Sequence, residues 1–84
     1  MSVETIKQNA EVLNEAIVNF NSYLLELESL RKSKLNSKDK GTKKLLEEQI
    51  SRLNIKITDM GNYISKIQIS IQKLIDEELN NNVT

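Results

Sequence analysis

The sequence predicts an all-α protein: an antiparallel two-helix hairpin with coiled-coil packing, which completes a four-helix bundle with a partner or a second copy. Three observations carry this prediction. Apolar residues recur at alternating steps of three and four in two long segments, proline is absent, and a polar stretch containing glycine separates the segments. Such steps place apolar side chains on one stripe of a helix, whereas a strand requires alternation at every second residue.

The first helix is predicted over about residues 3–33. The apolar spacing then ends, because Arg31, Lys34 and Lys38 occupy the next a and d positions of the heptad repeat. Up to that point the apolar stripe follows the a and d positions of a heptad repeat without a fault. Its members are Val3, Ile6, Ala10, Leu13, Ile17, Phe20, Leu24 and Leu27.

A loop over about residues 34–41 is predicted from its cluster of Ser, Asn, Asp, Gly and Lys. The second helix follows over about residues 42–79, with Thr42 as its N-cap. Residues 80–84 lack an apolar anchor and are predicted to be a disordered tail. The a and d residues of the second helix are Leu46, Ile50, Leu53, Ile57, Met60, Ile64, Ile67, Ile71 and Leu74.

The two stripes match each other when the chain is folded back within the loop. Ile6 then faces Ile71 and Phe20 faces Ile57, so that each a residue of one helix meets a d residue of the other. A single continuous helix of about 120 Å, paired with a second chain, is the alternative. Gly41 and the polar break favour the hairpin, although a domain-swapped dimer would keep the same layers.

The composition excludes most catalytic chemistry. The chain has no cysteine and no histidine, so it offers no thiol nucleophile, no histidine partner for a serine or threonine nucleophile and no thiolate or imidazole metal ligand. Paired carboxylates such as Glu47 and Glu48 are expected on a hairpin surface, where no cleft perturbs a pKa. We therefore expect no catalytic residue, no cofactor and no metal, and the protein is not expected to be an enzyme.

Charge and hydropathy restrict the partners and the location. Twelve basic and twelve acidic residues give a net charge of zero, which disfavours a general nucleic-acid binder. No run approaches the roughly 18 apolar residues that a membrane span requires. The first residues, Met1 to Glu4, lack the basic and apolar regions of a secretory signal. We expect a protein that is cytoplasmic, or secreted without a cleavable signal peptide.

A second apolar flank predicts the partner interface. Three residues at successive g positions of the first helix and one at a g position of the second would share one side of the hairpin, and two isoleucines at f positions would add secondary contacts. The expected partner is another helical protein or a second copy of the chain. The predicted interface comprises Ala16, Tyr23, Leu30, Ile55, Tyr63 and Ile69.

The opposite flank, at the e positions, is short, polar and uncharged. Gly61 would lie opposite Ala16 there, which permits a close approach of the two backbones. Two interpretations stay open: a flat contact face for another helix, or a glycine that avoids a clash within the hairpin. The flank consists of Asn14, Asn21, Asn54, Gly61 and Gln68.

A basic cluster marks the loop. Seven of the twelve positive charges fall within residues 31–44. They either bind an anionic partner, such as nucleic acid, phospholipid or an acidic protein surface, or form a solvated loop that opposes aggregation. These candidates are Arg31, Lys32, Lys34, Lys38, Lys40, Lys43 and Lys44.

The layout of a helix, a short turn with glycine and a longer helix resembles the small Trp-x-Gly (ESAT-six-like) hairpin proteins and the toxin-escort hairpins of type VII secretion. The turn Asp39-Lys40-Gly41 stands where those proteins carry Trp-x-Gly, with Asp39 in place of the tryptophan. Their C-terminal export pattern, a tyrosine followed four residues later by an acid, is missing, since Ile67 follows Tyr63 at that spacing. The resemblance implies that this chain is a secreted or co-secreted partner protein, which buries its apolar flank in a four-helix bundle. The co-chaperones of type III secretion needles have a similar layout.

The leading hypothesis is a non-enzymatic adaptor or chaperone that acts by helix packing. Two alternatives stay open. One is a small anion- or nucleic-acid-binding regulator that uses the lysine-rich loop, and the other is a structural coiled-coil subunit.

Overall fold

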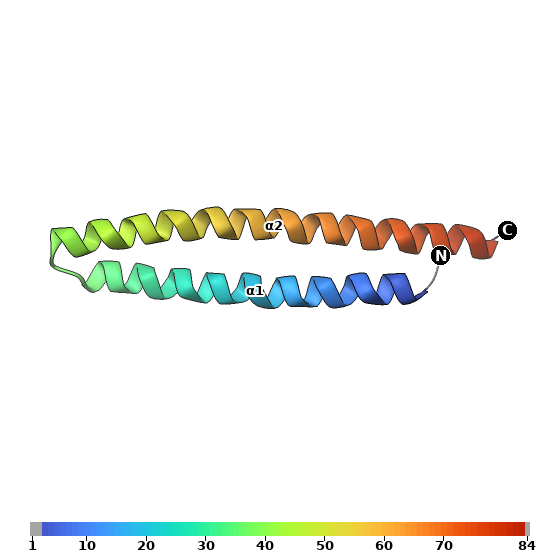
Figure 1. Cartoon of the computed structure of the whole chain (residues 1–84), viewed down its shortest axis with the longest axis horizontal. Helices are drawn as coiled ribbons and strands as arrows, with labels where there is room; N and C mark the ends of the chain where they lie inside the picture. The colour runs from blue at the N-terminus through green and yellow to red at the C-terminus, as the bar shows by residue number, and fades with distance from the viewer. Residues whose placement is uncertain (1–2, 84) are drawn as a thin grey trace.

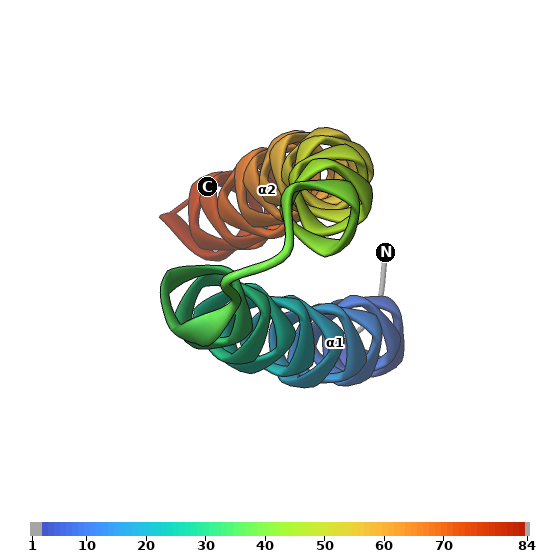
Figure 2. The same ribbon diagram turned by 90° about the vertical axis from the view of Figure 1, so that its left-hand side faces the viewer.

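The structure is a computed structural model that describes residues 3–83, with side chains described for residues 3–80. Helix α1 (Val3–Asn36) and helix α2 (Lys40–Val83) run antiparallel, side by side, and form a rod of 67 × 14 × 13 Å (Figure 1). The described residues contain no strand. The predicted all-α helical hairpin is thereby confirmed. Figure 2, viewed from the turn, shows the two helices inclined to each other.

The helix limits differ from the predicted ones at three places. α1 continues to Asn36, and α2 begins at Lys40, so the turn comprises only residues 37–39. α2 also continues to Val83, which gives helix over residues 80–83 where the sequence predicts a disordered tail. Residue 84 of that tail lies outside the described residues.

The core between the helices is small. Among the described side chains, the nearly inaccessible ones are Ala16, Leu27, Leu53 and Ile67, which are exposed by 3, 7, 5 and 8%. No polar or charged side chain in this range is buried. A single row of contacts between two helices therefore provides the whole core, and most seam residues remain in partial contact with solvent.

α2 uses its predicted a and d residues against α1, but α1 is rotated. The α1 residues Ala16 and Leu27 are buried, whereas Ile17 and Leu24, at predicted a positions, are exposed by 36 and 41%. α1 therefore faces α2 with its d and g positions. The physical reason is that α1 carries apolar residues at a, d and g, and a single neighbouring helix covers only two of these columns.

Two approaches between the helices define the register. A Cβ atom built on Gly61 would lie 3.6 Å from Cε1 of Phe20. Near the turn, Nζ of Lys34 lies 3.3 Å from Oε1 of Glu47. Phe20 was predicted to face Ile57, so α1 meets α2 about one helical turn further along the second helix than predicted. This shift along the rod accompanies the rotation of α1, which turns the g residues of α1 towards α2 in place of its a residues.

Candidate protein-interaction surfaces

The turn is closed by Asp39, which caps the N-terminus of α2. Its Oδ2 atom accepts hydrogen bonds from the backbone N of Thr42 at 3.0 Å and from Oγ1 of Thr42 at 2.8 Å. The side-chain bond from Thr42, followed by the backbone bond, holds the pKa of Asp39 below its ordinary value. The prediction that Thr42 is the N-cap was therefore wrong. Thr42 lies three residues inside the cap and donates to it.

A steric constraint in this turn explains why residue 41 is a glycine. Neither glycine of the chain adopts a positive φ angle, so a left-handed backbone is not what requires glycine here. A Cβ atom at position 41 would lie 3.3 Å from Oδ2 of Asp39, which is tighter than ordinary contact. The absence of a side chain leaves room for the capping carboxylate.

The basic cluster is only partly neutralised. Lys34 pairs with Glu47 across the hairpin, and Nζ of Lys32 lies 3.3 Å from Oε1 of Glu28 within α1. The remaining basic side chains of the cluster are exposed and form no ion pair with any described residue. They are Arg31, Lys38, Lys40, Lys43 and Lys44.

The six residues of the predicted partner interface lie in three different places. Ala16 is buried between α1 and α2, so it is not accessible to a partner of the folded hairpin. Tyr23 and Leu30, at g positions of α1 that face α2, are half-buried, and Tyr63 is 48% exposed. The two remaining residues, Ile55 and Ile69, are exposed by 63 and 68%, in line with their predicted f positions facing away from α1.

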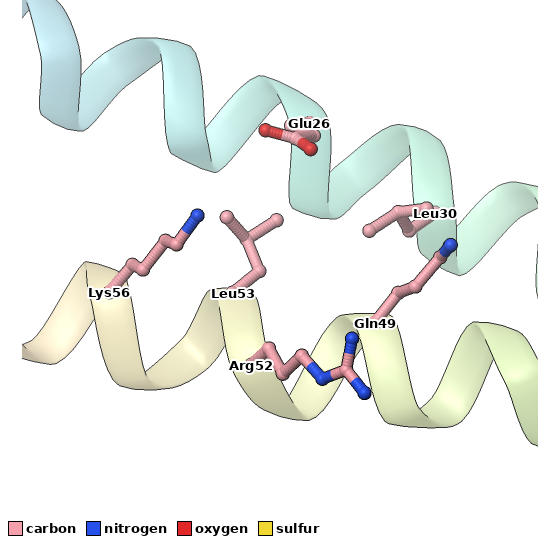
Figure 3. Close-up of a pocket in the computed structure, with 6 residues that line it drawn as sticks. All are labelled: Glu26, Leu30, Gln49, Arg52, Leu53 and Lys56. Atoms are coloured by element: carbon pink, nitrogen blue, oxygen red, sulfur yellow. The ribbon is translucent and has the colours of Figure 1, made fainter.

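Tyr23, Leu30 and Tyr63 line one continuous side of the hairpin, which we call the tyrosine groove. It joins two shallow hollows of about 250 and 360 Å³ that share Lys56. Figure 3 shows Leu53 extending from α2 towards α1, with Lys56 and Gln49 on either side of it. Charged residues make up much of the lining, namely Glu26, Arg52, Lys56 and Asp59.

The opposite side of the hairpin, which we call the uncharged face, has a different chemistry. A hollow of about 290 Å³ near the turn is lined by Arg31, Lys34, Leu35 and Ile50. Residues seven positions apart share a face of a helix, so this side continues from Arg31 and Leu35 back along α1, and from Ile50 forward along α2. Its central residues are Ala10, Asn14, Ile17, Asn21 and Leu24 of α1 and Ile50, Asn54, Ile57, Gly61, Ile64, Gln68, Ile71 and Ile75 of α2.

No residue in that central set carries a charge, and its isoleucines on α2 are only half-buried. The set contains the e-position flank that the sequence indicated. The sequence interpretation missed Ile17 and Leu24, because the predicted seam assigned both to the interior of the hairpin. Ile17 and Leu24 are exposed because α1 is rotated, and the local sequence pattern does not predict this rotation.

Over residues 3–80, no group of three or more acidic side chains is arranged to hold a metal ion. Neither helix contains a stretch, among the described residues, that is long and apolar enough to cross a membrane. What the described surface does present is helix faces of contrasting polarity.

Comparison of the chain with known protein families, curated proteins and solved structures gives no significant match.

Proposed function

We propose that this chain is a non-enzymatic protein-interaction module, an adaptor or chaperone that binds another helical protein by helix packing. One observation carries the proposal. Beside a core of four buried side chains, twelve large apolar side chains are exposed by 36 to 84%. Two of the twelve, Ile17 and Leu24, lie on the uncharged face beside the half-buried isoleucines of α2, and an apolar stripe of this kind is typical of binding sites.

The geometry supports helix packing as the mode of binding. Two helices in contact leave both flanks of the seam open, and a third or fourth helix laid along a flank covers the half-buried residues there. The half-buried isoleucines of the uncharged face recur at heptad spacing along the uninterrupted helix α2, so this surface offers a long stripe. An amphipathic helix is the natural ligand for such a stripe.

Site-specific photo-crosslinking in the cells that produce the protein tests this function. A photoreactive amino acid is placed at Leu24 on the uncharged face, at Tyr63 in the tyrosine groove, or at Asn62 on the outer side of α2. Crosslinks to protein are expected from at least one of the first two positions and not from Asn62. Equal yields at all three positions, or no protein crosslink at any, would contradict the proposal.

A role as a co-secreted partner or chaperone of a secretion system would be one form of this function. It is supported only by the resemblance in layout around Asp39-Lys40-Gly41. Masses of the crosslinked products test it, since a secreted protein or a secretion component should be among them.

A second candidate function is the binding of an anionic partner by the turn. The observation that favours it is the group of five exposed basic side chains near the turn that form no ion pair with any residue of the described range. Binding to DNA, RNA or acidic vesicles should then weaken with salt and with neutralisation of Lys38, Lys40 and Lys43. Absence of binding to all three probes at low ionic strength would dismiss this candidate.

A further inference from the structure

We infer that a second copy of this chain covers the uncharged face, with the turn of one copy over the open end of the other, in a two-fold symmetric four-helix bundle. The inference rests on the proposed function and names the partner for one surface. Three properties of the hairpin lead to it: the extent of the face, its symmetry and the distribution of charge along the rod.

The extent of the uncharged face suits a stable interface. From Ile50 to Ile75 it is about 38 Å long at 1.5 Å per residue. On α1 the uncharged residues extend only from Ala10 to Leu24, about 21 Å, so that with neighbouring axes about 8–10 Å apart the uncharged footprint is on the order of 500 Å² per copy. Stable interfaces bury about 600–1,000 Å² per partner, and a second hairpin reaches this range when its contact also includes the ends of the face, where Arg31 lies.

The face is also close to symmetric about its middle. Ile17 is the central member of the set on α1, and Gly61 and Ile64 are the central members on α2. A Cβ atom built on Gly61 would lie 3.6 Å from Cε1 of Phe20, which places these centres within about one helical turn of each other along the rod. A two-fold axis through this level, perpendicular to the helices, lays α1 on its own copy and α2 on its own copy. Every neighbouring pair of helices in the bundle is then antiparallel.

The charge distribution selects a second copy and its direction. Residues 31–44, at the turn, contain seven basic residues and one acidic residue. At the other end of the rod, residues 3–15 and 70–80 contain six acidic and two basic residues (Figure 1). Placing the turn of one copy over the open end of the other brings opposite charges together at both ends. Placing turn over turn brings like charges together, which is unfavourable.

The tyrosine groove does not suit the same role. Its lining includes Glu26, Arg52, Lys56 and Asp59, and these side chains would lose their hydration in a helix–helix interface. The central uncharged face contains only amides, a glycine, an alanine and aliphatic side chains, so its burial requires no charge to be desolvated. Of the two sides, the uncharged face is therefore the one that a second hairpin covers.

A matched pair of double variants tests the interface on the purified full chain. Asn21→Glu with Asn54→Glu introduces charges on the uncharged face at exposed positions. Asn19→Glu with Asn62→Glu introduces the same charges at exposed positions away from it. By light scattering across a concentration series, the unmodified chain and the second variant should have the mass of a dimer. The first variant should have the mass of a monomer, with its helical circular dichroism retained under the same conditions.

Distances between spin labels test the direction. A cysteine introduced by Lys38→Cys carries a label at the turn of each copy. The proposed direction predicts a separation comparable to the 67 Å length of the rod, whereas turns packed together predict a short distance. A short distance would overturn the head-to-tail arrangement.

The results separate this inference from the proposed function. A monomeric unmodified chain, or identical masses of the two double variants, overturns the inference. If the crosslinking at Leu24 or Tyr63 nevertheless captures a different protein, the proposed function stands and only the second copy is excluded. If both experiments are negative, both proposals fail.

Discussion

The Oδ2 atom of Asp39 accepts both the backbone N–H and the hydroxyl of Thr42, at 3.0 and 2.8 Å. These two bonds, together with the bond from the backbone N of Lys43 to the carbonyl O of Asp39 at 3.0 Å, fix the first turn of α2 immediately after the reversal of the chain. Because the turn comprises only residues 37–39, the start of α2 sets the direction in which it leaves. The carboxylate of Asp39 thus caps α2 at the residue where the hairpin turn ends.

Substitution of Asp39 by alanine should lower the melting temperature of the hairpin by a few degrees, because the first N–H groups of α2 lose their acceptor. Asp39→Asn should have a smaller effect, since an amide oxygen still accepts a hydrogen bond at an N-cap. Thermal unfolding followed by circular dichroism at neutral pH measures both. Equal stability of Asp39→Ala and the unmodified chain would show that the cap does not contribute in solution.

The same carboxylate should make stability depend on acid pH. Its folded-state pKa lies below the ordinary value of an aspartate, so the unfolded chain binds the proton more tightly. The contribution is therefore present above about pH 4 and is lost as the pH falls through the lowered folded-state pKa. The difference in stability between the unmodified chain and Asp39→Asn should shrink over that window. A constant difference from neutral pH to pH 2 would exclude this linkage.

Gly61→Ala should stabilise the isolated hairpin by up to about 1 kcal/mol, because alanine has the higher helix propensity. The new Cβ atom would lie 3.6 Å from the ring of Phe20, an ordinary contact. This distance argues against the interpretation that Gly61 avoids a clash within the hairpin, since α1 does not require a glycine there. Urea unfolding at low protein concentration gives the free energy. Gly41→Ala is the contrasting variant, because its Cβ atom would crowd Asp39 at 3.3 Å and no gain is expected. A loss at Gly61 would indicate that something outside the hairpin approaches it.

The rotation of α1 is tested at Ala16. Ala16→Leu should destabilise the hairpin by about 1–3 kcal/mol, because the position is 3% exposed and the extra volume must displace α2. Asn19→Leu, on an exposed position of the same helix, should change the free energy of unfolding by less than about 0.5 kcal/mol. If α1 instead used its a and d positions, Ala16→Leu would be as neutral as the control.

Much of this fold could be predicted from the sequence, and the unpredicted parts have specific causes. Unbroken heptad spacing is sufficient to identify both helices and the seam of α2 from Ile50 to Leu74. The spacing could not decide which two of three apolar columns on α1 face α2, because either Ala16 or Ile17 can be buried against a neighbouring helix. That choice depends on how tightly the turn closes, and both Asp39 and Thr42 are suitable cap residues.

The candidate surfaces, too, could be predicted from the sequence only in part. The polar flank with Asn21 and Gly61 could be seen in the sequence, since it needs only helical periodicity. Its aliphatic half, with Ile17 and Leu24, could not, because their exposure results from the rotation of α1 in three dimensions. The charge asymmetry between the turn and the open end is present in the sequence, but it becomes an asymmetry along a rod only when the chain is folded back.

The ion pair between Lys34 and Glu47 provides a test of the register. Both side chains are substantially exposed, at 41 and 56%, so the interaction should contribute only about 0.2–1 kcal/mol. A double-mutant cycle with Lys34→Ala and Glu47→Ala should give a coupling energy in that range, and it should decrease with added salt. Lys34→Glu combined with Glu47→Lys should recover part of the stability lost in either single reversal. The pairing predicted from the sequence sets Lys34 about one turn away from Glu47, beside another lysine, and would give no coupling. The absence of a coupling energy at low ionic strength would therefore favour the register predicted from the sequence. A measurable coupling energy supports the register of the structure, which places Phe20 beside Gly61.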